Sequence, residues 1–153
     1  MQLIEYPEHY TPDGSPTLYL ARSGTGRPGW QSDAVALLDA AGFTGSVLNP
    51  QPCNRSTSGM GAAAGWQEHN LRRIGAILLW CPHGAQQVLD VRQRFLHRSR
   101  TELVVGCDLD QRAQRFVHAE LIAAIPRLAV STGLAATLRA ALDCLGAPAA
   151  TRH

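Results

Sequence analysis

Short apolar runs alternate along this chain with longer segments whose apolar residues recur at helical spacing. Such runs, closed by glycine, proline or asparagine, are typical of strands that are buried on both sides. They predict five strands, at residues 18–21, 46–48, 76–80, 103–106 and 128–130. The helical stripes predict helices over residues 30–41, 66–73, 86–97, 110–125 and 132–145. Because strands and helices alternate, we expect an α/β three-layer fold with a five-stranded parallel sheet.

The two ends of the chain differ from this pattern. Residues 1–16 contain Pro7, Pro12, Gly14 and Pro16, and are expected to form an extended N-terminal lead-in. Residues 17–145 carry all the predicted strands and helices and are expected to form a single domain, which suits a chain of 153 residues. Residues 146–153 are expected to be a frayed tail.

Composition narrows the classes of function. The chain is 45% hydrophobic and 17% charged, which is ordinary for a globular protein. Its net charge of +2 is too small to indicate a nucleic-acid partner. No apolar run approaches the ~20 residues that span a bilayer, so no membrane partner is expected. The N-terminus lacks the pattern of a secretory signal, and we expect a cytoplasmic location.

Neither the cysteines nor the histidines show the spacing of a metal site. The four cysteines lie far apart without a C-x-x-C pair, and no two of the six histidines have H-x-x-x-H spacing. We therefore expect no metal and no cofactor. Cys81 and Cys107 follow predicted strands, and both are expected to be small buried side chains in a reducing compartment.

Ligands of parallel α/β sheets bind at the carboxyl ends of the strands. Candidate ligand-binding residues at these ends, and on the helix before the third strand, are Ala21, Arg22, Ser23, Gly24, Asn49, Trp66, Trp80, His83 and Asp108. The glycine-rich loop after the first strand could wrap a phosphate or a ribose through its backbone N–H groups. Its alternative is a plain flexible turn, because the acidic residue of dinucleotide-binding loops is absent about 20 residues further on.

Several other candidates also have a structural interpretation. Asn49 precedes Pro50, and an Asn-Pro pair commonly forms a turn. Trp66 and Trp80 are either platforms on which a base stacks or anchors of the core, and the core interpretation is favoured. Asp108 follows a buried strand and is then a turn residue ahead of the next helix.

A series of motifs follows in a fixed order over most of the chain, roughly from residue 12 to residue 142. It comprises a strand ending in Leu-Ala, a glycine-containing loop, a Trp-initiated helix, a strand ending in Asn-Pro, a second Trp helix and a strand ending in Trp-x-Pro. The residues that carry these motifs are Leu20, Ala21, Gly24, Gly26, Trp30, Asn49, Pro50, Trp66, Leu71, Trp80 and Pro82. In their order and spacing, they make the chain resemble the nucleoside 2-deoxyribosyltransferase-like family.

The resemblance implies a flavodoxin-like fold with a five-stranded parallel sheet. It also implies a nucleoside or nucleotide as the small-molecule partner, and cleavage or exchange of its N-glycosidic bond. In such enzymes a Glu carboxylate attacks the sugar C1′ to form a glycosyl-enzyme intermediate, and a second acidic group assists departure of the base.

The chain departs from this family at the acidic positions. The family's Ala-Gly reads Ala21-Arg22, its Trp-Glu reads Trp66-Gln67 with Glu68 next, and its Ala-Asp has Gly75 in place of Asp. The nucleophilic Glu should open the helix after Trp80, yet the only acid between residues 81 and 101 is Asp90.

The catalytic candidates are therefore Asp90, as nucleophile or electrostatic stabiliser, and Glu68, as general acid. Alternatively, Asp90 is a structural acid near a helix N-terminus, where its negative charge interacts favourably with the helix dipole. We expect a nucleoside- or nucleotide-binding protein with weak or altered N-glycosidic cleavage or transfer. The alternative is a catalytically inactive ligand-binding or regulatory domain.

A homodimer or higher homo-oligomer is also expected. The resemblance implies it, and the predicted helix at residues 86–98 adds independent support, because its apolar residues cover more than one face. These residues are Val88, Leu89, Val91, Phe95 and Leu96. A two-fold partner would cover the face that does not pack on the sheet. The alternative is that Leu89 and Leu96 are single exposed apolar residues.

Overall fold

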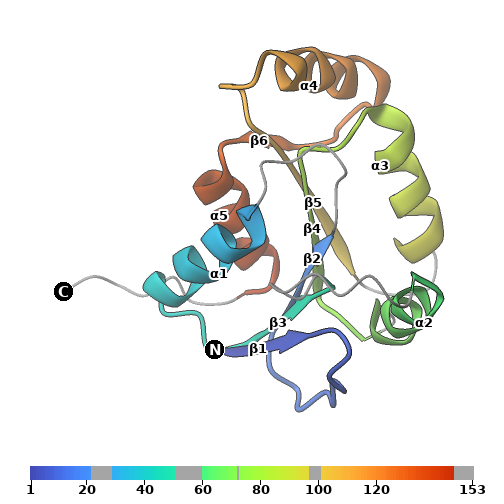
Figure 1. Cartoon of the computed structure of the whole chain (residues 1–153). Coiled ribbons are helices and arrows are strands. Elements are labelled where there is room, and N and C mark those ends of the chain that lie inside the picture. Colours follow the sequence, from blue (N-terminus) through green and yellow to red (C-terminus); the bar gives the residue numbers. More distant parts are fainter. Residues whose placement is uncertain (22–28, 51–59, 72, 97–100, 147–153) are drawn as a thin grey trace.

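The computed structural model describes residues 1–21, 29–50, 60–71, 73–96 and 101–146. Its sheet has six strands in the order β1-β3-β2-β4-β5-β6, and every neighbouring pair is parallel. The strands are β1 (Gln2–Glu5), β2 (Thr17–Ala21), β3 (Ser46–Asn49), β4 (Ala76–Trp80), β5 (Glu102–Cys107) and β6 (Val130–Thr132). The expected α/β three-layer arrangement, with helices on both sides of a parallel sheet, is confirmed (Figure 1).

The sixth strand corrects the expected number of five. β1 lies within the segment that was expected to be an extended lead-in, and it pairs with β3 along its whole length. Its Ile4 is only 2% exposed and belongs to the core. A four-residue segment with one buried apolar side chain is too short for periodicity to reveal. The pairing with β3 is what makes it a strand.

The helices form the two outer layers. On one side of the sheet lie α1 (Trp30–Ala40) and α5 (Leu134–Cys144), and on the other lie α2 (Met60–Leu71), α3 (Ala85–Val91) and α4 (Arg112–Ala124) (Figure 1). α3 continues into a π-helical turn, η1 (Arg92–Leu96), so the predicted α-helix at residues 86–97 changes its winding halfway. α2 begins at Met60, six residues before the predicted start at residue 66.

Each face of the sheet carries its own apolar core. Leu18 and Leu20 of β2 pack towards α1 and α5, whereas Tyr19 and Ala21 pack towards α2, α3 and α4. Successive side chains of a strand point to opposite faces, so a strand buried on both faces is apolar at every position. This explains why the strands appear in the sequence as unbroken apolar runs.

The strand order locates the region where ligands bind in folds of this kind. Apart from β1, the order is the flavodoxin-like one, because the chain adds β3 on one side of β2 and then returns to add β4 on the other. Ligands of such folds bind beside the carboxyl ends of the two strands at this reversal, which are β2 and β4 here. Among the described residues, no helix combines the length and the apolar character that a membrane crossing needs.

Candidate functional site

The candidate site is the edge of the sheet where β2 and β4 end. β2 ends at Ala21, which is buried beneath the helices of the α2–α4 side. Three predicted ligand-binding residues, Arg22, Ser23 and Gly24, lie outside the described residues, as do residues 51–59 after β3. The part of this edge that the structure describes consists of the segment after β4 and the neighbouring helices α3 and α4.

The chain leaves β4 through a residue in the left-handed region of backbone space. Cys81 has a φ of 52°, an uncommon value for a residue with a side chain, while its N–H still donates to the Gly106 carbonyl at 2.8 Å. Pro82 follows, and its carbonyl accepts a 3.4 Å hydrogen bond from Nε2 of the buried Gln114 on α4. The turn after β4 is therefore held both by β5 and by α4.

His83 lies on the surface beyond this turn. Its side chain is exposed, and its backbone N–H donates to Oε1 of Gln87 at 2.7 Å. Gln87 on α3 thus provides an acceptor for the His83 N–H, which lies between the end of β4 and the start of α3. The imidazole is thus exposed just beyond the carboxyl end of β4.

A carboxylate from a distant part of the sequence lies at the start of α3. Oε1 of Glu120 on α4 accepts a hydrogen bond from the Ala85 N–H at 3.3 Å. A Cβ built on Gly84 would lie 3.1 Å from Oε2 and 3.4 Å from Oε1 of the same carboxylate. An acid thus stands where the helix after β4 begins, although the segment itself contains no Glu. Sequence reasoning missed it because 35 residues separate the two groups.

The two predicted catalytic acids lie on different helices and are both exposed. Asp90 is in the second half of α3, and its Oδ1 accepts a 2.8 Å hydrogen bond from Nε2 of Gln86, one helical turn earlier. Glu68 is near the end of α2, which leads towards the amino end of β4. α3 instead starts at the carboxyl end of β4. The chain direction therefore places Glu68 towards the opposite end of the sheet from the start of α3.

Two predicted ligand-binding residues contact the segment around β1. The indole N–H of Trp66 donates to the Glu8 carbonyl at 2.6 Å, and its ring meets Tyr6 edge-on with centroids 6.0 Å apart. Asn49 is 3% exposed, and its Nδ2 donates to Oε1 of Glu5 at 3.0 Å. Both side chains therefore join β3 and α2 to the N-terminal strand and the residues after it.

Trp80 and Asp108 also have structural partners. Trp80 is 3% exposed and belongs to the core between the sheet, α1 and α5, as the core interpretation expected. Asp108 accepts hydrogen bonds from the Asp110 N–H at 3.1 Å and from Nε2 of Gln111 at 3.4 Å, as expected for a turn residue.

Two buried thiols lie beneath this edge. Cys81 and Cys107 are fully buried and free of disulfides. Burial raises the pKa of the Cys81 thiol to about 11, and the nearby Asp108 carboxylate adds to the rise while the Asp108 N–H opposes it. Burial, together with the neighbouring Cys81, raises the pKa of Cys107 to about 12. Both groups are protonated at neutral pH and are not nucleophiles, in agreement with their expected role as small buried side chains.

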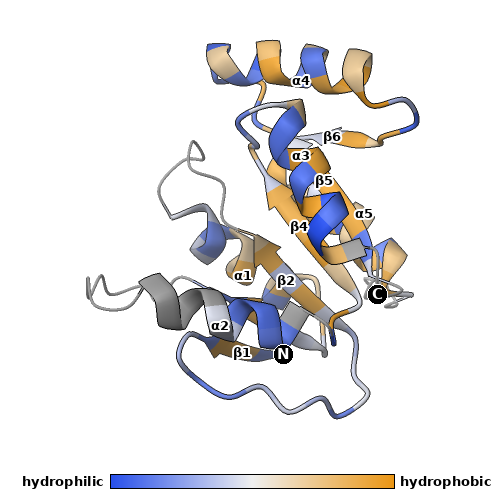
Figure 2. Cartoon of the chain, turned by 90° about the vertical axis from the view of Figure 1, so that its right-hand side faces the viewer, coloured by the Kyte–Doolittle hydropathy of each residue, from blue (hydrophilic) through white to orange (hydrophobic). Residues whose placement is uncertain are grey.

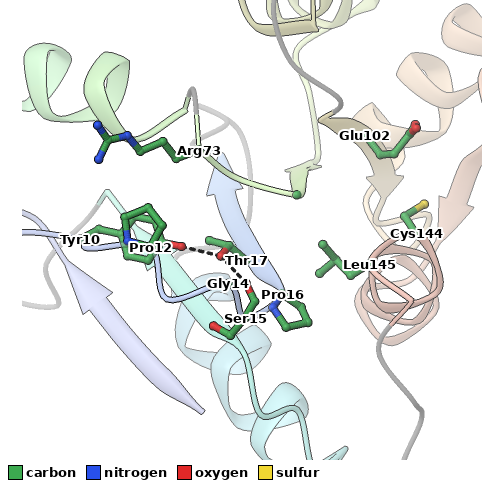
Figure 3. Close-up of a pocket in the computed structure, with 11 residues that line it drawn as sticks. Tyr10, Pro12, Gly14, Ser15, Pro16, Thr17, Arg73, Glu102, Cys144 and Leu145 are labelled. Carbon is green, nitrogen blue, oxygen red and sulfur yellow. Dashed lines mark hydrogen bonds between the residues drawn. The ribbon is translucent and has the colours of Figure 1, made fainter.

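A cavity of about 430 Å³ lies at the opposite edge of the sheet, near the amino ends of β2, β4 and β5 (Figure 3). Its wall includes Tyr10, whose hydroxyl shares a 2.7 Å hydrogen bond with Thr17 Oγ1. The guanidinium of Arg73 and the carboxylate of Glu102 are directed away from the space between β2 and α5 (Figure 3). The cavity therefore has no charged group aimed at a ligand among the side chains drawn.

Within the described parts of the chain, no three His, Cys, Asp or Glu side chains form a group that could hold a metal ion. Comparisons with protein-family models, with curated proteins and with solved structures found no match to this chain. The fold, the edge of the sheet around β4 and the resemblance in sequence are therefore the features that bear on function.

Proposed function

We propose that this protein binds a nucleoside or nucleotide at the carboxyl ends of β2 and β4. The strand order is the observation that carries the proposal. The chain places β3 on one side of β2 and β4 on the other, and ligands of such folds bind where the strand order reverses in this way. Part of the resemblance to nucleoside 2-deoxyribosyltransferase-like proteins is carried by the ends of the same two strands, at Leu20 and Ala21 of β2 and at Trp80 of β4. The fold and the sequence resemblance therefore favour the same edge of the sheet.

The polar groups around α3 suit the sugar part of such a ligand. Glu120 presents a carboxylate beside Gly84, and a carboxylate is the group that accepts hydrogen bonds from ribose hydroxyls in other nucleotide-binding α/β folds. His83 is exposed two residues before Ala85 and adds a second polar side chain. Arg22 adds a positive charge to the loop after β2, which favours a phosphorylated ligand.

Cleavage or transfer at the N-glycosidic bond is the second candidate function. It requires a carboxylate that reaches the sugar C1′, and Asp90 with Glu68 as general acid is the pair offered by the sequence. Asp90 already bonds to Gln86 on the exposed side of α3, and Glu68 lies towards the other end of the sheet. These placements favour the alternative of ligand binding without turnover.

Thermal unfolding in the presence of nucleosides, nucleoside monophosphates and NAD tests the binding proposal. A ligand at 100 times its dissociation constant adds about 2.7 kcal/mol to the stability and raises the unfolding temperature. We expect Arg22→Ala to weaken the shift given by monophosphates and to leave that of the matching nucleosides unchanged. A panel in which no member shifts the transition would refute nucleoside or nucleotide binding.

Chromatographic detection of released base tests the second candidate on the same ligands. Binding without turnover predicts a thermal shift and no multiple-turnover release. Steady release by the wild-type chain that is lost in Asp90→Ala would establish the catalytic alternative. Release that persists in Asp90→Ala would exclude the proposed nucleophile while leaving ligand binding intact.

A cytoplasmic location is also part of the proposal. Cys81, Cys107 and the exposed Cys144 are free thiols, which suits a reducing compartment. Fractionation of the cells that produce the chain, with detection by an antibody, checks this location.

A further inference from the structure

α4 holds a carboxylate against the turn that follows β4. The helix lies beside the start of α3 (Figures 1 and 2). In its first turn, Nε2 of the buried Gln114 donates to the Pro82 carbonyl at 3.4 Å. Two turns later, Oε1 of Glu120 accepts from the Ala85 N–H at 3.3 Å. Leu121, the next residue, is fully buried, so the backbone that carries the carboxylate is fixed to the core.

The second oxygen of this carboxylate is open to a ligand. In the part of the chain that the structure describes, Oε2 of Glu120 makes no hydrogen bond, and the side chain is exposed. A side chain at residue 84 would crowd this oxygen, because a Cβ built on Gly84 lies 3.1 Å from it. Gly84 is extended, with a φ of 169°, so its conformation does not itself require glycine. The absence of a side chain there therefore leaves room beside Oε2.

A carboxylate restricts the part of a nucleotide that can lie here. An ionised carboxylate only accepts hydrogen bonds, and its two oxygens offer about four acceptor positions. The bond to Ala85 uses one of them. A phosphate group carries the same sign of charge and is repelled. Ribose instead has two adjacent hydroxyl groups, at C2′ and C3′, that can both donate to one carboxylate, whereas 2-deoxyribose retains only the one at C3′.

We propose that Glu120 makes this site selective for ribonucleosides or ribonucleotides over their 2′-deoxy counterparts. The inference rests on the proposed binding of a nucleoside or nucleotide at the carboxyl ends of β2 and β4. The carboxylate accepts from both sugar hydroxyls while it keeps its bond to the Ala85 N–H. A site built to bind a hydroxyl group rejects an analogue that lacks it, because a polar group of the site is left without its partner. The sugar thus differs from the 2-deoxyribose that the resemblance in sequence would suggest.

Isothermal titration calorimetry with paired nucleosides measures this selectivity. The probes are adenosine, guanosine, cytidine and uridine, and their 5′-monophosphates, each compared with its 2′-deoxy counterpart. The best-bound ribose compound should bind at least about 10-fold more tightly than its 2′-deoxy counterpart, as expected for the loss of one hydrogen bond to a charged group. The 3′-deoxy form of the same compound should be weakened in the same way, because the second hydroxyl is then missing.

Glu120→Gln separates ligand binding from the contact with α3. The amide oxygen of glutamine can still accept from the Ala85 N–H, but hydrogen bonds of a neutral group are weaker than charge-assisted ones. The preference for ribose should therefore fall at least several-fold, and in Glu120→Ala it should disappear. A role of Glu120 confined to the start of α3 would instead weaken the ribose and 2′-deoxy compounds equally and leave the preference unchanged.

Glu102→Gln and Glu102→Ala are the matched controls. Glu102 is also exposed, and it begins β5 at the opposite edge of the sheet. Both variants should keep the preference of the wild type. Circular dichroism and thermal unfolding of each variant establish that it folds.

The outcomes separate this inference from the proposed function. Ribose and 2′-deoxy compounds that bind the wild type equally well, or 2′-deoxy compounds that bind more tightly, would overturn the inference and leave nucleoside binding intact. A preference for ribose that Glu120→Ala retains in full would overturn the assignment to Glu120. Failure of every nucleoside and monophosphate to bind would refute the proposed function itself, and the inference with it.

Discussion

At the scale of single residues, the sheet contains a position where only glycine fits. A Cβ on Gly106 of β5 would collide with Oγ1 of Thr137 on α5 and would lie 2.8 Å from Cε3 of Trp80. Thr137 is fully buried and donates its hydroxyl to the Gly133 carbonyl at 2.9 Å, so it has little freedom to move away. The missing side chain of Gly106 lets α5 approach the sheet.

Gly106→Ala should therefore lower the free energy of unfolding by about 2 kcal/mol, because the added methyl overpacks the contact between β5 and α5. Gly65→Ala is the matched control. Gly65 lies inside α2, is exposed, and has no atom within 4 Å of an added Cβ. Alanine should stabilise that helix by roughly 0.5–1 kcal/mol. Urea unfolding measures both, and two changes of the same sign would contradict this account.

The two buried thiols make the stability depend on alkaline pH. An unperturbed thiol here loses its proton near the ordinary pKa of 9.0, whereas the folded chain holds the pKa of Cys81 at about 11 and that of Cys107 at about 12. Above pH 9 the unfolded chain therefore binds fewer protons than the folded one, and stability falls as pH rises towards 11–12. The contribution is fully present below pH 9.

Urea unfolding at pH 8 and at pH 10.5 should show this loss, and Cys107→Ala should show a smaller loss between the same two pH values. Part of the loss remains in the variant, because Cys81 is still present and burial also raises the pKa of Tyr19. Cys144→Ala is the comparison: burial raises the pKa of this thiol as well, but the thiol is exposed, and its removal should reduce the loss by less than that of Cys107. An equal loss in Cys107→Ala and in Cys144→Ala would exclude the buried thiol as its source.

At the scale of elements, α4 supplies a hydrogen-bond acceptor for a backbone N–H group in the first turn of α3. Gly84, which precedes α3, makes no side-chain cap, and the Ala85 N–H is instead bonded to the Glu120 carboxylate. A carboxylate at a helix start also interacts favourably with the helix dipole. The contact therefore couples two helices that follow different strands.

Glu120→Ala should cost about 1 kcal/mol of stability, as the loss of a helix-capping hydrogen bond usually does. Asp90→Ala on the same helix α3 is the comparison, because it removes only the exposed bond to Gln86, worth roughly 0.2–0.5 kcal/mol. Chemical denaturation of both variants decides the point. A cost in Glu120→Ala that does not exceed that of Asp90→Ala would mean that the bond to Ala85 contributes nothing.

At the scale of the whole molecule, the N-terminal residues complete the sheet. β1 covers the edge of β3, and the Tyr6 N–H continues the pairing by donating to the Asn49 carbonyl at 3.2 Å. Trp66 then fixes α2 against the carbonyl of Glu8. An edge strand that is covered in this way is protected from pairing with other chains.

Two neighbours on β1 test whether this strand is part of the folded core. Ile4→Ala should cost about 2–4 kcal/mol, because Ile4 is 2% exposed and its truncation leaves a cavity. Leu3→Ala should cost less than about 1 kcal/mol, since Leu3 is 37% exposed on the same strand. Thermal or chemical unfolding compares them directly. Equal, small costs would show that β1 does not contribute to the stability.

The candidate site was predictable from the sequence only in its general place. The burial of Trp80 and the turn role of Asp108 could be anticipated, because a residue at the end of an apolar run has few alternatives. The partners of Trp66 and Asn49 could not, since both are bonded to residues around a strand that the pattern did not reveal. The contact of the Glu120 carboxylate with the start of α3 could not be predicted either, because the two groups are 35 residues apart in the sequence.

Local sequence patterns were enough to predict the class of fold and every strand and helix apart from β1. Continuous apolar runs and helical stripes are both local. A strand in a parallel sheet covered on both faces is apolar throughout because every one of its residues is buried, and a helix that packs on the sheet has an apolar stripe because one of its faces is buried. The order of the strands, the pairing of β1 with β3, and the contact between Glu120 and the start of α3 follow from long-range packing. These features depend on how crossovers pack against one another, and residues that meet there are separated by tens of positions that carry no local sign of the contact.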